Sequence, residues 1–269
     1  MTTEELFNLI MTRKSVRTFD GTPIPRGDRD KLESYIRSVP NPFGIDIDLS
    51  IYDARENGLS SPVINGEDLY VCGKVVKQKY GELAFGYSFE KFVLYAWSLG
   101  IGTTWIGGTL DRKKFESLIG LKPEERMYAV SPLGYPSSIK SDVDSRLRTR
   151  VKGDTRFPFS DLFFDRDFST PLVVDKAKDK NLRMALEAVR WYPSAANMQP
   201  CRIVRDGNRF HFFEHHTKKY DEVNYGDVQK LDMGIALCHF MSLVGGTISF
   251  NNPGIKTDSD TEYILTVTL

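Results

Sequence analysis

The second half of this chain repeats the pattern of the first half, and this recurrence limits the possible folds more than any single motif. The offset between matched positions drifts from about 150 to about 135 residues, which indicates two diverged copies of one unit. We therefore predict two related halves; the alternative is one irregular α+β domain in which helices and strands simply alternate. The matched segments are 98–102 with 242–246, Pro40 with Pro193, and 128–130 with 263–265.

Hydrophobic periodicity assigns helices and strands to both halves. Apolar residues at helical spacing, bounded by a T-x-x-E capping box, prolines or glycines, predict helices at 3–10, 28–38, 89–99, 115–121, 182–189 and 231–243. Apolar runs and alternation predict strands at 45–52, 69–76, 127–133 and 262–269, and a hairpin over 201–214 with Asp206-Gly207 at its turn. The polar, basic residues 137–160 are expected to form mostly a solvated linker, so the halves are 1–160 and 161–269.

Charge and length exclude several classes of partner. The 269 residues carry 36 basic and 36 acidic side chains, so no basic surplus indicates nucleic acid or an anionic membrane. No apolar run reaches the roughly 18 residues of a membrane span, and the N-terminus does not have the pattern of a secretory signal. Three cysteines without a CxxC motif fit a reducing compartment. The sequence predicts a cytoplasmic protein with a small-molecule partner.

A short basic cluster, Arg13-Lys14-Ser15-Val16-Arg17, is the first candidate binding element. Two guanidinium groups, an ammonium and a hydroxyl within five residues can surround a phosphate group. On charge pattern alone, a solvated loop after a helix is the favoured interpretation.

Two further segments combine small, amide and glycine residues. Residues 193–200 (PSAANMQP) follow a helix and could place backbone N–H groups and amides against a polar ring edge, or could simply be a loop. Residues 99–108 (LGIGTTWIGG) contain G-x-G but follow a helix rather than a strand and lack the later glycine, which excludes a dinucleotide-binding fingerprint. Their glycines still permit close approach of the backbone to a flat ligand.

The histidines near the C-terminus do not predict a metal site. His211, His215 and His216 lie close to Glu214, but no further ligand of defined spacing accompanies them. His239 lies in an apolar helix and is interpreted as a buried, hydrogen-bonded histidine. We predict no bound metal.

Three motifs together resemble the FMN-dependent nitroreductases. Residues 13–25 (RKSVRTFDGTPIP) resemble their opening R-R-S-I-R-x-F, residues 193–200 resemble their P-S-x-x-N-x-Q-P segment, and residues 98–108 followed by Leu133-Gly134-Tyr135-Pro136 resemble their glycine-rich stretch and G-Y-P turn. The order departs from ordinary members, in which the P-S-x-x-N segment closely follows the first motif; here residues 38–44 occupy that place. The chain is most similar to a putative nitroreductase subgroup with two nitroreductase-like halves fused in one chain.

The resemblance implies an α+β, nitroreductase-like fold: a single-chain pseudo-dimer of two helix-flanked mixed or antiparallel sheets. One FMN site per chain would be composite, with the basic arm from the first half and the P-S-x-x-N loop from the second. The implied cofactor residues are Arg13, Lys14, Ser15 and Arg17 of the arm; Trp105, Ile106, Gly107 and Gly108 beside the ring; Pro193, Ser194 and Asn197 of the loop; and Arg156, with Lys152 as a weaker candidate. Arg148 and Arg150 are expected to be solvated.

The implied activity is FMN-dependent oxidation of NAD(P)H, with ping-pong hydride transfer to nitroaromatic, quinone or similar acceptors. No catalytic side chain is predicted, because the flavin carries the chemistry. A functional monomer is implied, since the ordinary dimer interface would already lie inside the chain. Two alternatives stay open: a flavin-binding protein with little turnover, used for sensing or storage, and a flavin-modifying or dehalogenating enzyme of the same superfamily.

Overall fold

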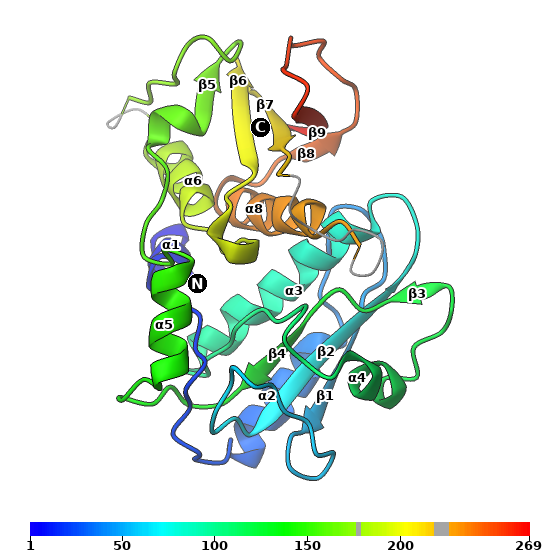
Figure 1. Cartoon of the computed structure of the whole chain (residues 1–269). Coiled ribbons are helices and arrows are strands. Elements are labelled where there is room, and N and C mark those ends of the chain that lie inside the picture. The colour runs from blue at the N-terminus through cyan, green and yellow to red at the C-terminus, as the bar shows by residue number, and fades with distance from the viewer. Residues whose placement is uncertain (176–178, 218–225) are drawn as a thin grey trace.

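The computed structural model describes residues 1–175, 179–217 and 226–269, and its helices and strands form an α+β fold (Figure 1). The helices are α1 (Thr3–Thr12), α2 (Arg26–Ile36), α3 (Gly81–Ser98), α4 (Arg112–Leu118), α5 (Asp142–Arg150), α6 (Lys180–Arg190) and α8 (Val228–Val244), with short 3-10 turns η1 (Phe159–Asp161) and η2 (Ala195–Asn197). The strands are β1 (Asp48–Asp53), β2 (Leu69–Val76), β3 (Glu125–Arg126), β4 (Val130–Leu133), β5 (Phe163–Asp165), β6 (Cys201–Asp206), β7 (Arg209–His215), β8 (Thr247–Ser249) and β9 (Thr261–Thr268). Within the described residues, no helix has the length and apolarity that a membrane span requires.

The first sheet is antiparallel and centres on β2. β1 pairs along one edge of β2, while β4 and β3 pair along the other edge. β2 is buried along most of its length, as its run of apolar residues predicts. One apolar cluster joins its face to α2 and α3, and a second cluster on the other side includes Phe115 of α4.

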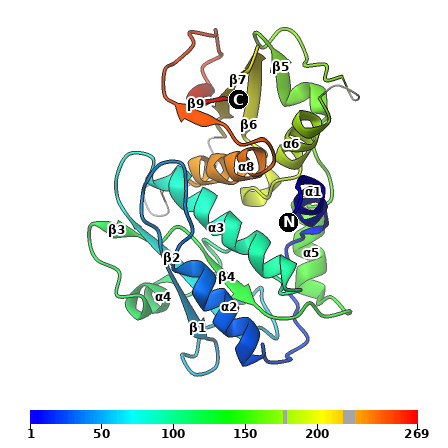
Figure 2. The ribbon, with the colours of Figure 1, turned by 180° about the vertical axis from the view of Figure 1, so that it is seen from behind.

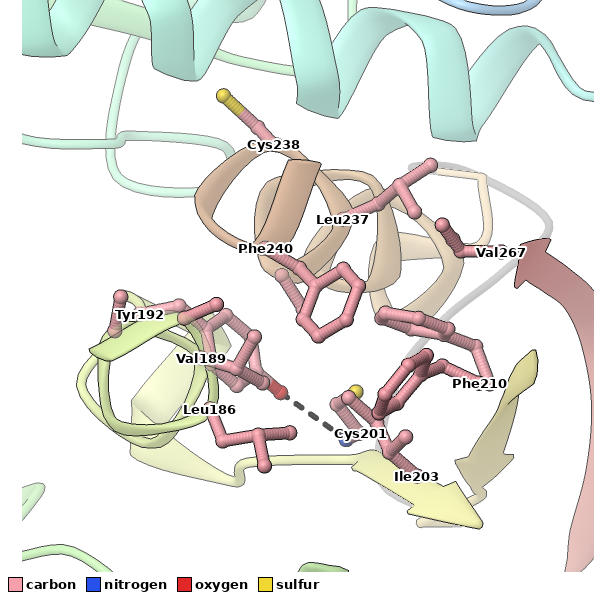
Figure 3. Packing of buried hydrophobic residues seen from close by; sticks show 14 of the residues in the cluster. Leu186, Val189, Tyr192, Cys201, Ile203, Phe210, Leu237, Cys238, Phe240 and Val267 are labelled. Carbon is pink, nitrogen blue, oxygen red and sulfur yellow. Dashed lines mark hydrogen bonds between the residues drawn. The ribbon is translucent and has the colours of Figure 1, made fainter. Parts of the chain in front are cut away.

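The second sheet is mixed, in the order β5-β6-β7-β9-β8. Only β5 and β6 run parallel; the other neighbours are antiparallel. α6 and α8 pack on this sheet through an apolar cluster that includes Leu186, Ile203 and Phe240 (Figure 3). The buried hydroxyl of Tyr192, just after α6, accepts the N–H of Cys201 at 3.1 Å and fixes the start of β6 against the helix.

The two long apolar helices α3 and α8 lie between the sheets in both views (Figures 1 and 2). Their backbones touch at two glycines: a Cβ added to Gly86 would overlap the carbonyl of Leu231, and one added to Gly234 would overlap the carbonyl of Leu83. Leu231 lies three residues before Gly234, and Leu83 lies three residues before Gly86. The two contacts are therefore equivalent when the helices are exchanged. This reciprocal contact has the form expected of two elements related by a two-fold axis.

The cores of the two halves interlock. Leu83, Tyr87 and Leu94 of α3 belong to the apolar cluster of the second sheet, as does Ile10 of α1, while Leu231 of α8 belongs to the cluster of the first sheet. The N-terminal helix therefore packs against the half of the chain from which it is remote in sequence.

Several sequence expectations are confirmed and a few need correction. The predicted strand 69–76 and the capping box of α1 are observed, and Gly100 ends the α3 region with a φ of 76°. The solvated linker predicted for 137–160 is wrong, because α5 forms there. Ser141 caps this helix and its Asp144 is buried. β1 begins at Asp48 rather than Ile45, and the hairpin turn consists of Gly207 and Asn208, one residue later than predicted.

Candidate functional site

A cavity of about 770 Å³ lies where the two halves of the chain meet. Its wall combines stretches that are far apart in sequence and come from both halves. Every predicted cofactor residue lines it except Ile106 and the weaker candidate Lys152. The wall consists of 10–15 with Arg17, Thr104, Trp105, Gly107, Gly108, Tyr128, Ala129, several residues of 148–156, Trp191, 193–197 and four residues of α8.

Arg13 follows the last turn of α1, and its guanidinium is buried in the cavity wall. The buried Ile10 anchors this end of the helix, and the side chain of Arg13 is only 4% exposed. Its Nε and Nη1 have no hydrogen-bond partner among the described residues, and its Nε lies 3.7 Å from Oε1 of Glu90. Burial lowers the pKa of Arg13, and the charge of Glu90 opposes this shift. A buried guanidinium with unused donors is a binding group for an oxyanion.

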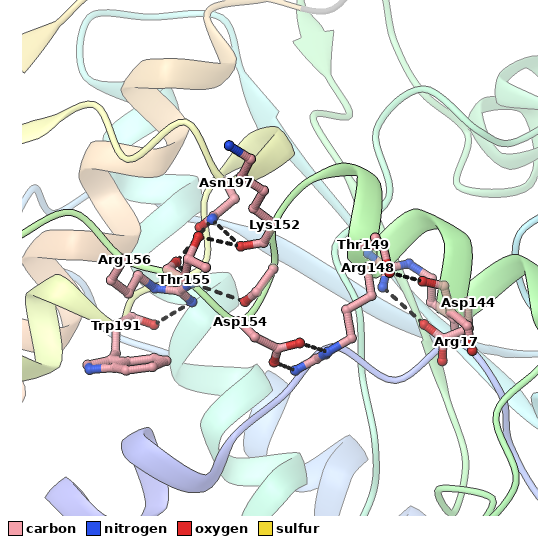
Figure 4. Close-up of polar contacts among 12 residues, drawn as sticks. Arg17, Asp144, Arg148, Thr149, Lys152, Asp154, Thr155, Arg156, Trp191 and Asn197 are labelled. Atoms are coloured by element: carbon pink, nitrogen blue, oxygen red, sulfur yellow. Dashed lines mark hydrogen bonds and ion pairs between the residues drawn. The ribbon is translucent and has the colours of Figure 1, made fainter.

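The rest of the basic arm is fixed by pairing with the glycine-rich stretch. Ser15 forms a β-bridge with Thr103, and the N–H of Val16 donates to the carbonyl of Thr103 at 2.8 Å. Arg17 forms an ion pair with the buried Asp144 at 3.4 Å (Figure 4). Lys14 is exposed at the cavity edge. Arg13 is thus the buried member of the arm that faces the cavity with unused donors among the described residues.

The glycine-rich stretch lines the cavity on both sides of Ile106. Thr104, Trp105, Gly107 and Gly108 face it, and the buried Oγ1 of Thr104 has no partner among the described residues. Ile106 does not contribute, because its backbone N–H and C=O both pair with Val130 and its side chain lies in the cluster with Phe115. Of the predicted residues 105–108, Ile106 therefore lies outside the cavity wall.

The loop 193–199 closes the opposite side of the cavity. Ala196, Asn197 and Gln199 all have positive φ angles, of 48°, 59° and 52°, an uncommon conformation that costs free energy for residues other than glycine. The Nδ2 of Asn197 donates to the carbonyls of Lys152 and Thr155, at 2.9 and 3.1 Å (Figure 4). The amide nitrogen thus holds the segment after α5 in place, while Asn197 as a cofactor residue stays a prediction.

Arg156 and Arg148 bring further positive charge to the wall. Arg156 lies over the ring of Trp191, 4.8 Å from its centroid, and its Nη1 donates to the carbonyl of Gly153 at 3.1 Å. Burial, with Arg13 nearby, lowers the pKa of Arg156 to about 10. Arg148 lines the cavity and forms a two-bond ion pair with Asp154, so the prediction that it is solvated is wrong, whereas Arg150 is exposed as predicted.

Sequence reasoning missed a buried carboxyl group in the cavity wall. Both carboxyl oxygens of Asp232 accept the N–H of Ala195, at 3.1 and 3.0 Å, which ties α8 to the loop 193–199. Burial, opposed by this hydrogen bond, raises the pKa of Asp232 well above its usual range. A single acidic residue inside an apolar helix is the only signal in the sequence, and it does not reveal which way the side chain points.

The residues behind Arg13 were also missed. Glu90 of α3 is fully buried, and its Oε2 accepts the Nε1–H of Trp105 at 2.9 Å. Its Oε1 lies 3.0 Å from Nε2 of His239, which belongs to α8. A charged residue and a histidine from opposite halves therefore meet immediately behind the cavity wall.

The candidate metal residues do not converge. Among the residues that the structure describes, no group of three His, Cys, Asp or Glu side chains could hold a metal ion. His211 pairs with Thr266 at 2.7 Å and His215 with Thr261 at 3.0 Å, on separate cross-strand positions.

The fold and the cavity define a nitroreductase-like α+β protein, in which two helix-flanked sheets enclose a composite site. The family described as “Putative TM nitroreductase” matches residues 5–243, and the chain belongs to this family. It is therefore a member of an oxidoreductase family. No curated protein matches the chain.

One solved structure shares this fold over the whole chain. A structure described as a putative nitroreductase from Thermotoga maritima MSB8 is 19% identical, with a TM-score of 0.62, and the match covers 100% of this chain and 94% of that one. A nitroreductase family protein from Clostridium novyi NT is 19% identical over 52% of this chain and 90% of its own, with a TM-score of 0.42. An FMN-dependent nitroreductase from Clostridium difficile R20291 is 15% identical over 51% of this chain and 92% of its own, also with a TM-score of 0.42.

Proposed function

We propose that the chain is an FMN-dependent NAD(P)H oxidoreductase that reduces nitroaromatic, quinone or similar acceptors, with one composite FMN site. The observation that carries this proposal is Arg13, whose buried and unused guanidinium donors lie in a cavity shared with the loop 193–197 of the other half. The two motifs are 180 residues apart in the sequence, yet they line one space.

The residues present fit FMN. A phosphate group matches the unused donors of Arg13, with Lys14 and Ser15 beside them. The wall also offers apolar surface for a flat ring, from Trp105, Leu231 and other residues. The partnerless Oγ1 of Thr104 provides a hydrogen-bonding group for a polar ring edge.

The mechanism follows from what these residues can do. When bound, FMN supplies the hydride chemistry, so no side-chain nucleophile is required. Arg13 binds and orients the phosphate, the apolar wall excludes water, and Trp105 is held in position by its hydrogen bond to Glu90. NAD(P)H enters and leaves the pocket before the acceptor enters, because one space serves both partners.

A fused pseudo-dimer would have a second, equivalent site, and we propose that aromatic side chains fill it. Tyr80 precedes Gly86 by six residues, as the cavity-lining Val228 precedes Gly234. The rings of Tyr80 and Phe250 stack at 3.9 Å, and Phe43, from the segment that replaces the P-S-x-x-N loop, lies 6.1 Å from Tyr80. This cluster leaves one FMN site per chain.

Steady-state kinetics of the FMN-loaded protein test the proposal. We expect NADH or NADPH oxidation that depends on a quinone or nitroaromatic acceptor, with parallel double-reciprocal plots. Bound flavin without acceptor-dependent turnover would favour the storage or sensing alternative. Failure to bind FMN would overturn the proposal altogether.

A further inference from the structure

Glu90 and His239 form a fully buried pair across the junction of α3 and α8. Both side chains are 0% exposed, and Oε1 of Glu90 lies 3.0 Å from Nε2 of His239. On the other side of the imidazole, Nδ1 lies 2.9 Å from the carbonyl oxygen of Ala188. Each half of the chain therefore contributes one member of the pair.

The hydrogen bonds determine how many protons this pair carries. A backbone carbonyl only accepts, so Nδ1 of His239 must carry a proton. The contact between Nε2 and Oε1 then needs one more proton, on either the imidazole or the carboxyl, because two unprotonated acceptors would repel each other at 3.0 Å. In both arrangements the pair as a whole is neutral.

The same carboxylate oxygen faces the basic arm. Oε1 of Glu90 is the atom that lies 3.7 Å from Nε of Arg13, whereas Oε2 is occupied by Nε1–H of Trp105. A carboxylate with a full negative charge at this place would cancel the charge that Arg13 presents to an oxyanion. A neutral pair can fix the position of the guanidinium without cancelling its charge.

We propose that His239, from the second half, is a positioning residue for Arg13: its shared proton keeps Glu90 from competing with the phosphate of FMN. The inference rests on the proposed function, since it concerns the same site. It predicts that the histidine matters for phosphate binding although it lies behind the wall of the cavity.

Binding of FMN and of riboflavin, which lacks the phosphate, tests the proposal. Dissociation constants are measured by flavin fluorescence for the wild-type chain, His239→Gln, Glu90→Gln and the double variant. In His239→Gln the imidazole no longer shares a proton with Glu90, so on this proposal the carboxylate competes for Arg13. We expect FMN binding to weaken roughly tenfold, as for loss of a charge-assisted contact, while riboflavin binding changes less than about threefold.

The other two variants separate this role from simple packing. Glu90→Gln should change FMN binding less than about threefold, and adding it to His239→Gln should restore FMN binding to near the wild-type value. A double variant that binds FMN more weakly than His239→Gln, or an equal loss for riboflavin and FMN, would overturn the inference. Absence of flavin binding in the wild-type chain would instead overturn the proposed function. Thermal unfolding checks that every variant is folded.

Discussion

Arg13 is the residue on which the phosphate assignment depends, because its buried donors have no partner among the described residues. Arg13→Ala removes a charge-assisted contact worth about 1.5–3 kcal/mol, so FMN affinity should fall about 10- to 150-fold. Titration of the apoprotein with FMN measures this loss. Arg150→Ala is the matched control, because Arg150 is exposed; Arg148 is unsuitable, since it lines the cavity. An unchanged affinity in Arg13→Ala would show that the phosphate lies elsewhere.

The buried carboxyl group of Glu214 should make the free energy of unfolding depend on pH. Burial, with a smaller contribution from Asp227, raises the pKa of Glu214 from 4.5 to about 7. Because the folded state holds this proton more tightly than the unfolded state, its contribution is fully present below pH 4.5 and is lost as the pH rises through 7. Glu214→Gln should lack this loss, which amounts to at most about 3 kcal/mol. Urea unfolding from pH 4.5 to 8 of both chains measures it; parallel stability curves would contradict it.

At the scale of single residues, cavity residues that belong to sequence motifs could be predicted better than those that belong to helices. The arm and the loop have local spacing that a resemblance can match, and their residues do line the cavity. Glu90, Asp232 and His239 belong to apolar helices, where only the packing of α3 against α8 decides what each side chain meets. Arg148 was wrongly predicted because the helix that turns it towards the cavity was itself missed.

At the scale of elements, the crossing of α3 and α8 is the most constrained contact. Gly86→Ala or Gly234→Ala would press a methyl group against the opposite backbone, which cannot move aside as a side chain can. We expect destabilisation of about 2–3 kcal/mol, although alanine favours an isolated helix by about 1 kcal/mol. Gly27→Ala in α2, where nothing lies within 4 Å, is the control and should be neutral or stabilising. Denaturant unfolding compares the three variants; equal stabilities would contradict this helix contact.

Long apolar elements could be located from the sequence, whereas the polar helix α5 could not. β2 is a run of apolar residues and α8 a long apolar stretch, so both could be located from the sequence. α5 is polar along almost its whole length, and its order depends on the Ser141 cap and on the pairing of Asp144 with Arg17. The pairing with Arg17 joins segments 127 residues apart and leaves no local signal.

At the scale of the molecule, the two halves should not fold separately. Residues 1–160 alone would expose Leu83, Tyr87, Leu94 and Ile10, which are buried in the cluster of the second sheet. We expect this fragment to lack a cooperative unfolding transition, because it would leave these apolar side chains in water. Circular dichroism with urea checks this. A stable, cooperatively unfolding monomer of residues 1–160 would show that the halves are independent domains.

The recurrence in the sequence predicted two sheets with their long helices packed together, but not how the chain crosses between them. α1 belongs to the first half by sequence but packs into the core of the second, where its apolar face contacts α6 and α8. Sequence matches between the halves show which elements correspond. They do not show whether an element packs into the core of its own half or of the other half.

The stoichiometry of FMN distinguishes one composite site from two equivalent sites, since a composite site with an aromatic-filled counterpart permits one FMN per chain. Titration of the apoprotein with FMN, combined with native mass spectrometry, measures both the number bound and the state of association. We predict one FMN bound to a monomeric chain of 30.6 kDa. Two FMN per chain, or FMN bound only by a dimer, would contradict the account.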